Sequence, residues 1–182
     1  PNRLYYSGSN GEGGLTEITQ VDYEVVAAEY VGGYVFFTTF DGLYVAPYED
    51  LTAYEKISNL TELTGDEMIL DMAYNSKDGK LYALTGFVQD KLNGKTSQNK
   101  NSLYTIDFTN GALTKVADIT AKLFPGTSGD GSPVALRTLA IDAAGNFYSV
   151  SAGRSRFFVY FYTWTLDSIV DGKVANDNDI LR

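Results

Sequence analysis

The feature that most constrains the fold of this chain is a unit of short strands and glycine-containing turns that occurs three times. Each copy is expected to contain an apolar strand, a turn, an aromatic strand, a second turn and two further strands. The copies span residues 22–64, 68–121 and 134–182, and residues 3–21 form a partial copy with two strands around a Gly-rich turn. A repeated strand–turn unit predicts an all-β chain built from an array of small sheets.

The turns and the alternation within the strands favour antiparallel pairing. Dipeptides such as Asp78-Gly79 and Asn110-Gly111 contain residues that tolerate the positive φ angles of tight hairpins. In the segment SLYTIDF, Tyr104 and Ile106 are expected on one face of a strand and Leu103 on the other. Helical periodicity is almost absent, so hairpins rather than helices connect the units.

The second and third copies contain DGKLYALTG…NSLYTIDFTNGALTKV and AAGNFYSVSA…VYFYTWTLD. On these residues the chain resembles β-propeller repeat proteins of the broad YVTN, NHL and quinoprotein-like type. The anchor pairs of the first two copies, Tyr34-Val35 and Leu81-Tyr82, are about 47 residues apart, within the span of a propeller blade. The third anchor pair, Phe147-Tyr148, follows a longer gap that contains Leu123–Pro133, an expected loop between blades.

The resemblance implies an all-β propeller or propeller segment, with about three clear four-stranded blades plus a degenerate partial blade. Residues 1–182 are then a single propeller-like domain or a fragment of one. Propellers usually close with about four to eight blades. The chain starts at Pro1 without a Met and ends at Arg182, which favours a piece of a larger ring over a compact four-bladed form. The same resemblance implies a bacterial exported protein, located at the cell surface, in the periplasm or outside the cell.

Composition excludes several classes of function. The formal net charge is −9 at neutral pH, which disfavours nucleic-acid binding because such proteins need Lys and Arg to displace counterions. The chain has no Cys and no His, so disulfides, thiolate nucleophiles, histidine bases and Cys- or His-ligated metals are all excluded. No apolar run is long enough to span a bilayer, and direct membrane insertion is not expected.

Carboxylates are the remaining candidates for acid–base chemistry. Glu67 and Asp71 begin the expected inner strand of the middle copy, and Asp142 ends that of the last copy. Propeller glycosidases use a pair of carboxyl groups on either side of a glycosidic bond. The favoured interpretation is nevertheless structural, because acidic residues commonly occupy turns and strand ends in an acidic protein. No catalytic residue is therefore assigned.

Three oxygen-rich stretches raise the alternative of a calcium site: Asn75–Gly79, Ser128–Ser132 and Asn176–Asp179. Calcium requires about six to eight oxygen ligands, and none of the stretches matches the EF-hand spacing. Asn and Asp are also the residues that tight turns prefer. We therefore expect turns and no cofactor, with Ca²⁺ as the alternative.

The expected binding surface consists of loops on a rigid scaffold. The polar stretch Gln89–Asn101, with Lys91 and Lys95, is predicted to interrupt a hairpin as a solvated insertion, with partner binding as the alternative. Asp130 lies in the expected loop between blades, and Asp71 and Arg137 lie near the inner strands. These five residues are the candidate binding residues.

The aromatic run Arg156–Leu166 has two interpretations. Its rings are predicted to lie in a strand that is packed on both faces, with a carbohydrate-stacking platform as the alternative.

The sequence thus favours a non-catalytic binding or scaffold module for a protein or glycan partner. The protein partners considered include other fragments of the same protein. The alternative is a glycan-active enzyme that uses Asp71 and Asp142.

Overall fold

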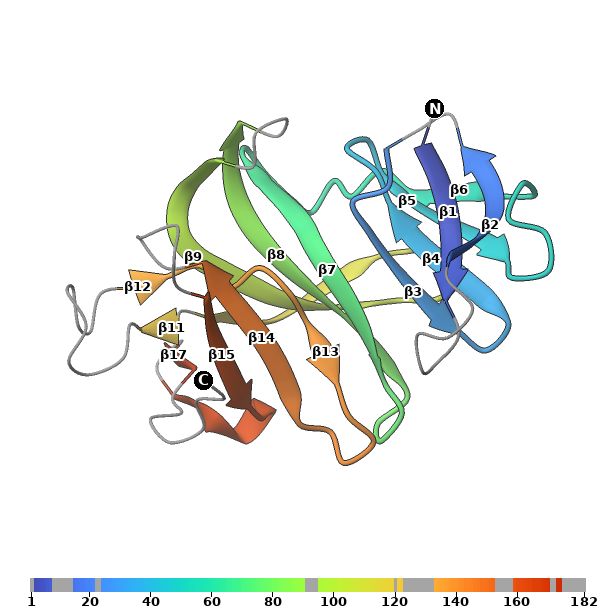
Figure 1. The fold of residues 1–182 in the computed structure, drawn as a ribbon. Coiled ribbons are helices and arrows are strands. Elements are labelled where there is room, and N and C mark those ends of the chain that lie inside the picture. Colours follow the sequence, from blue (N-terminus) through green and yellow to red (C-terminus); the bar gives the residue numbers. More distant parts are fainter. Residues whose placement is uncertain are drawn as a thin grey trace. The chain divides into compact units, whose positions relative to one another are not determined.

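The computed structural model describes residues 2–7, 15–21, 24–90, 95–119, 121–122, 133–152, 159–170 and 173–174. In these ranges the regular structure is β-strand, apart from one turn of 3-10 helix, η1, at Leu166–Ser168. The chain divides into two compact units, Pro1–Asn59 and Leu60–Arg182 (Figure 1). No helix in the described ranges is long and apolar enough to cross a membrane.

The first unit contains a strand pair and a four-stranded sheet, both antiparallel. The pair is formed by β1 (Asn2–Ser7) and β2 (Leu15–Val21). Sheet 1 contains, in chain order, β3 (Ala27–Val31), β4 (Tyr34–Thr38), β5 (Leu43–Pro47) and β6 (Glu55–Ser58). The antiparallel β1–β2 pair is consistent with a degenerate partial blade.

The second unit contains two larger antiparallel sheets and two short strand pairs. Sheet 2 is formed by β7 (Glu67–Asn75), β8 (Lys80–Asp90), β9 (Lys95–Ile106) and β10 (Leu113–Ile119). Sheet 3 is formed by β13 (Ala140–Ile141), β14 (Phe147–Ala152) and β15 (Val159–Trp164). The pairs are β11 (Ala121–Lys122) with β12 (Pro133–Val134), and β16 (Ile169–Val170) with β17 (Lys173–Val174). The first strands of sheets 2 and 3, β7 and β13, lie side by side (Figure 1).

The anchor residues take the same place in each sheet. Tyr34, Leu81 and Phe147 lie at or next to the start of the second strand. The turns before the second and third anchors contain Gly79 and Gly145, whose φ angles of 71° and 83° lie in the left-handed region that favours glycine. The repeated sequence therefore corresponds to a repeated hairpin.

Aromatic and aliphatic side chains join sheets 2 and 3 into one core. Tyr82 and Leu84 of β8 are buried against side chains of sheet 3 that include Phe147 and Trp164. The rings of Phe147 and Trp164 stack with centroids 4.5 Å apart, and Tyr82 meets Phe147 edge-on at 5.2 Å. Stacked and edge-on rings add to the free energy gained from apolar burial, so this cluster fixes how the two sheets pack.

Two expectations about the sheets need correction, on Gln89–Asn101 and on β15. Gln89–Asn101 is not wholly a loop insertion, because β8 continues to Asp90 and β9 begins at Lys95, while residues 91–94 lie outside the described residues. Sheet 3 has three strands in the described residues, and residues 153–158, 171–172 and 175–182 lie outside them. The aromatic strand β15 is buried on one face only: Tyr162 and Trp164 are 3% and 1% exposed, whereas Phe161 is 46% exposed. Sheet 3 covers sheet 2 with one face, and alternation directs Phe161 away from that face.

Candidate functional site

The carboxylate of Asp71 links sheets 2 and 3. Asp71 lies on β7 directly after an irregularity in its pairing with β8. Its Oδ2 accepts a hydrogen bond from the backbone N–H of Leu139 at 2.7 Å, and its Oδ1 accepts one from the N–H of Met72 at 2.9 Å. Burial raises the pKa of Asp71, and the two N–H donors lower it by a smaller amount. Both oxygens are thus engaged in holding β7 to the segment that leads into β13.

Asn101 makes a second link between the same parts of the unit. Its Oδ1 accepts a hydrogen bond from the N–H of Leu136 at 2.8 Å, and its Nδ2 donates to the Leu136 carbonyl at 3.0 Å. The same Nδ2 donates to the carbonyl of Thr85 at 2.8 Å. Asn101 is fully buried. The sequence does not indicate this role, because a single Asn among polar neighbours gives no signal that distinguishes a buried amide from an exposed one.

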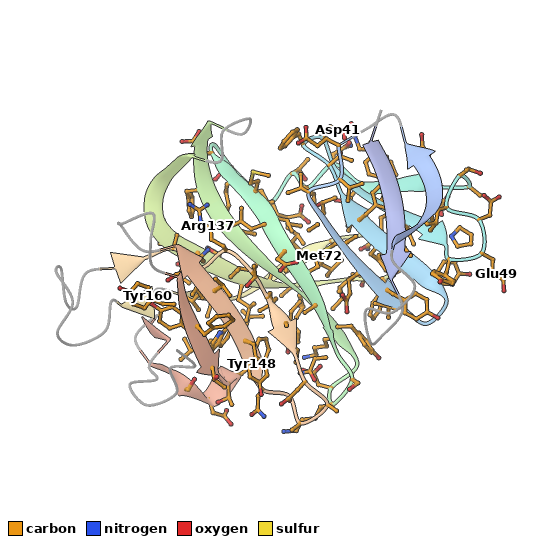
Figure 2. The ribbon with its side chains drawn as sticks, viewed as in Figure 1. Asp41, Glu49, Met72, Arg137, Tyr148 and Tyr160 are labelled. Atoms are coloured by element: carbon orange, nitrogen blue, oxygen red, sulfur yellow. The ribbon has the colours of Figure 1, made fainter. Side chains whose placement is uncertain are left out.

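Arg137 follows Leu136 and stands beside this link. Its backbone N–H donates to the carbonyl of Val150 at 2.7 Å. Figure 2 shows Arg137 near the end of β14. The side chain is half-buried, and it forms no ion pair with any residue that the structure describes. Arg137 contributes nothing to the pKa of Asp71, so the structure does not pair these two candidate residues.

The strands β8 and β9 continue past the rest of sheet 2. The strand β7 pairs with β8 only as far as Phe87, and β10 pairs with β9 only from Asn101 onward. Beyond these positions the register pairs β8 and β9 with each other, at Val88 with Thr96 and at Asp90 with Lys95. We call Val88–Lys100 the hairpin extension (Figure 1). In its described part, β8 and β9 are hydrogen-bonded to each other, and β7 and β10 do not pair with them there.

The candidate lysines belong to this extension. Lys95 is the first residue of β9, whereas Lys91 lies outside the described residues, as does the fifth candidate, Asp130. Lys100 lies at the base of the extension, and its Nζ is 4.5 Å from the centroid of the Phe87 ring. The lysine is exposed and forms no ion pair with a described residue. The base of the extension therefore combines a cation with an aromatic ring.

Asp142 and Glu67 have structural partners of their own. Asp142 accepts hydrogen bonds from the N–H groups of Ala144 and Asn146, from the Asn146 side chain and from the Tyr148 hydroxyl. The bond from the Asn146 side chain is the largest of the effects that lower the pKa of Asp142. The buried Glu67 accepts through Oε1 from the Thr85 hydroxyl at 2.6 Å and from the Tyr104 hydroxyl at 3.3 Å. Asp142 thus closes a turn and Asp71 joins two sheets, a division of roles that does not resemble a catalytic pair.

The stretch Asn75–Gly79 is a turn. Asn75 Oδ1 accepts from the N–H of Lys77 at 3.0 Å, and Asp78 accepts from the N–H of Lys80 at 3.1 Å and from the Tyr82 hydroxyl at 2.7 Å. Within the described ranges no group of three or more acidic residues could hold a metal ion. The stretches Ser128–Ser132 and Asn176–Asp179 lie outside the described residues.

Antiparallel sheets of three and four strands, with first strands side by side, define a β-propeller, and solved structures agree. The chain is similar to an oligogalacturonate lyase in complex with manganese, with a TM-score of 0.51 and 13% identity over 91% of this chain and 40% of that one. It is similar to an exo-β-1,3-galactanase from Clostridium thermocellum (TM-score 0.53, 16% identity, 85% of this chain and 35% of that one). A GH43 β-1,3-galactosidase with galactodeoxynojirimycin gives a TM-score of 0.53 at 11% identity, over 93% of this chain and 64% of that one.

These likenesses show the fold, and the chain spans less than two thirds of the length of each of these proteins. Residues 43–150 match the family model described as a domain of unknown function, DUF4394, and the chain belongs to this family. No curated protein matches the sequence.

Proposed function

We propose that this chain is a non-catalytic, glycan-binding propeller module of an exported bacterial protein. The observation that carries the proposal is the hairpin extension, which continues past the outer strands of sheet 2. An isolated two-stranded hairpin is at best marginally stable in water. A hairpin that continues beyond the outer strands of a rigid sheet is better explained by a binding role than by stability.

The composition of the extension favours a glycan over a protein partner. Val88–Lys100 has the sequence VQDKLNGKTSQNK, in which Val88 and Leu92 are the apolar side chains and no aromatic residue or Arg occurs. Protein interfaces depend on large buried anchors, chiefly Trp, Tyr and Arg. Amides, hydroxyls and ammonium groups are instead the donors and acceptors that match the hydroxyl groups of a sugar. A protein partner, including another part of the same protein, is the outcome to expect if no glycan binds.

The alternative is a glycan-active enzyme, and the named activities of the three similar propellers favour it. Against it stand the hydrogen bonds of Asp71 and Asp142, which commit each carboxylate to a separate structural role. The proposal also includes repeats of the YVTN, NHL or quinoprotein-like type, which the repeated anchor residues support. A location outside the cytoplasm is what that resemblance implies.

The test is a panel of plant, microbial and animal polysaccharides, presented to the whole chain on an array and in affinity gels. In a second protein, residues 88–99 are replaced by Asn-Gly, which leaves Gly86 and Asn101 as the last pair of the β8–β9 register. We expect retention by at least one glycan, loss of retention in the shortened protein and an unchanged melting temperature. Release of reducing ends from a bound glycan would instead support the enzyme, and the absence of any glycan ligand would refute the proposed function.

A further inference from the structure

We infer that the glycan is anionic, carrying carboxylate or sulfate groups, and that Lys100 and Arg137 are the described residues that select it. This inference rests on the proposed function and adds the chemical class of the ligand. Its starting point is the local charge. The hairpin extension contains Lys91, Lys95 and Lys100 against the single acid Asp90, in a chain whose formal net charge is −9.

Lys100 and Arg137 belong to the same part of the second unit. The side chain of Asn101, the neighbour of Lys100, binds both backbone groups of Leu136, the neighbour of Arg137. Because these bonds are 3.0 and 2.8 Å long, the two cations belong to chain segments that are in direct contact. The buried amide of Asn101 therefore fixes the base of the extension against the segment that carries Arg137.

Both cations lack an acidic partner among the residues that the structure describes. The nearby Asp118 is already bound, by Lys115 at 2.8 Å and by the Ser102 hydroxyl at 2.7 Å. Those two bonds lower the pKa of Asp118 most, and the charge of Lys100 adds to the effect at longer range. Arg137 as a residue is half-buried, and its guanidinium has no carboxylate partner among the residues that the structure describes. A bound anion would supply the missing partner, and the planar guanidinium suits carboxylate and sulfate oxygens.

The overall negative charge does not prevent this binding. At physiological ionic strength the Debye length is about 8 Å, so a ligand at the extension responds mainly to charges near it. The Lys100 ammonium lies over the ring of Phe87, 4.5 Å from its centroid, and this contact holds the cation at the base of the extension. The ammonium is thus positioned to meet the charged group of an acidic sugar.

The test compares three polymers with one backbone: neutral dextran, carboxymethyl-dextran and dextran sulfate. We expect the whole chain to bind the two charged polymers in preference to dextran, with affinity that falls as salt is raised. The double variant Lys100→Gln/Arg137→Gln should bind about tenfold more weakly, since each exposed charge pair contributes up to about fivefold. The matched control is Lys77→Gln/Lys80→Gln, which removes the same charge at the opposite end of β8 and should change affinity less than about twofold. Melting temperatures verify that both variants fold.

The outcomes separate the inference from the proposed function. A stronger response to carboxylate than to sulfate, or the reverse, identifies which anionic group is recognised. Equal binding of dextran and its charged derivatives, or equal losses in the two double variants, would overturn the inference. If the polysaccharide panel then yields a neutral glycan that needs the hairpin extension, the proposed function stands without it. Binding to none of the polymers in either experiment would refute both.

Discussion

Replacing Asn101 by Ala should destabilise the second unit strongly. The change removes three hydrogen bonds, two to the backbone of Leu136 and one to the carbonyl of Thr85. A typical hydrogen bond contributes about 1 kcal/mol net, and a buried group left without a partner costs about 1–3 kcal/mol. Because Asn101, Leu136 and Thr85 are all fully buried, we expect a loss of about 3–5 kcal/mol in the free energy of unfolding.

Urea unfolding followed by tryptophan fluorescence measures this loss directly. Trp164 is the single tryptophan of the chain, and it is buried in the core that Asn101 helps to hold together. The matched control is Asn110→Ala, an exposed turn residue whose Oδ1 accepts one hydrogen bond from Ala112, for which we expect a loss below about 1 kcal/mol.

The variant Asn101→Asp sharpens the test. It keeps the size of the side chain and the acceptor for the Leu136 N–H, but it replaces the Nδ2 donor by an oxygen that faces two carbonyls. We expect it to be at least as destabilising as Asn101→Ala at neutral pH. If the free energy of unfolding of Asn101→Ala lies within about 0.5 kcal/mol of that of the unmodified protein, the Asn101 link does not hold the sheets together and the reasoning is wrong.

Three further predictions concern stability. Because the pKa of Asp71 is raised in the folded protein, the folded state binds the Asp71 proton more tightly than the unfolded state does. The resulting gain in the free energy of unfolding is complete below the ordinary pKa of 3.8 and is lost as pH rises through the folded pKa. Asp71→Asn should therefore destabilise the protein more at pH 3 than at pH 7, and a difference in urea midpoint that stays constant with pH would contradict this. Trp164→Phe removes part of the stack on Phe147 and should lower the free energy of unfolding by about 2 kcal/mol. Urea unfolding followed by circular dichroism measures this loss, and an unchanged free energy of unfolding would mean that Trp164 does not contribute to the core. Chelation with EDTA should leave the melting temperature unchanged if the oxygens of Asn75 and Asp78 serve only their turn, and a drop of several degrees would instead indicate a bound metal.

Expectations from sequence succeeded where the cause is local. Alternation and turn residues predict antiparallel hairpins because a strand has a side-chain period of two and because few residues accept a positive φ. Gly79 and Gly145 accordingly precede the second strands that start near Leu81 and Phe147. The confirmed all-β propeller fold follows from repeating this local unit.

Expectations failed where they relied on polarity alone or where the cause is a partner far away in the chain. Gln89–Asn101 is polar, and polarity predicts a loop, but the register of β8 and β9 continues into it because backbone pairing does not require apolar side chains. The one-sided burial of β15 depends on which face meets sheet 2, and the alternating pattern of Tyr162 and Phe161 is the same for either choice. Asp71 is a candidate for chemistry from sequence because it lies on the expected inner strand, whereas its bond to Leu139 joins residues 68 apart and leaves no local pattern.

The sequence by itself determined the class of secondary structure, the positions of the hairpins and the absence of thiol and imidazole chemistry, since these depend on residue identity and on contacts within a few residues. Only the tertiary structure decided that Asp71 and Asn101 serve to join sheets, because their partners Leu139 and Leu136 lie 68 and 35 residues away. It also decided that Arg137 is left without an acid among the described residues. Long-range pairs of this kind depend on how sheets pack, and a local pattern contains no information about that packing.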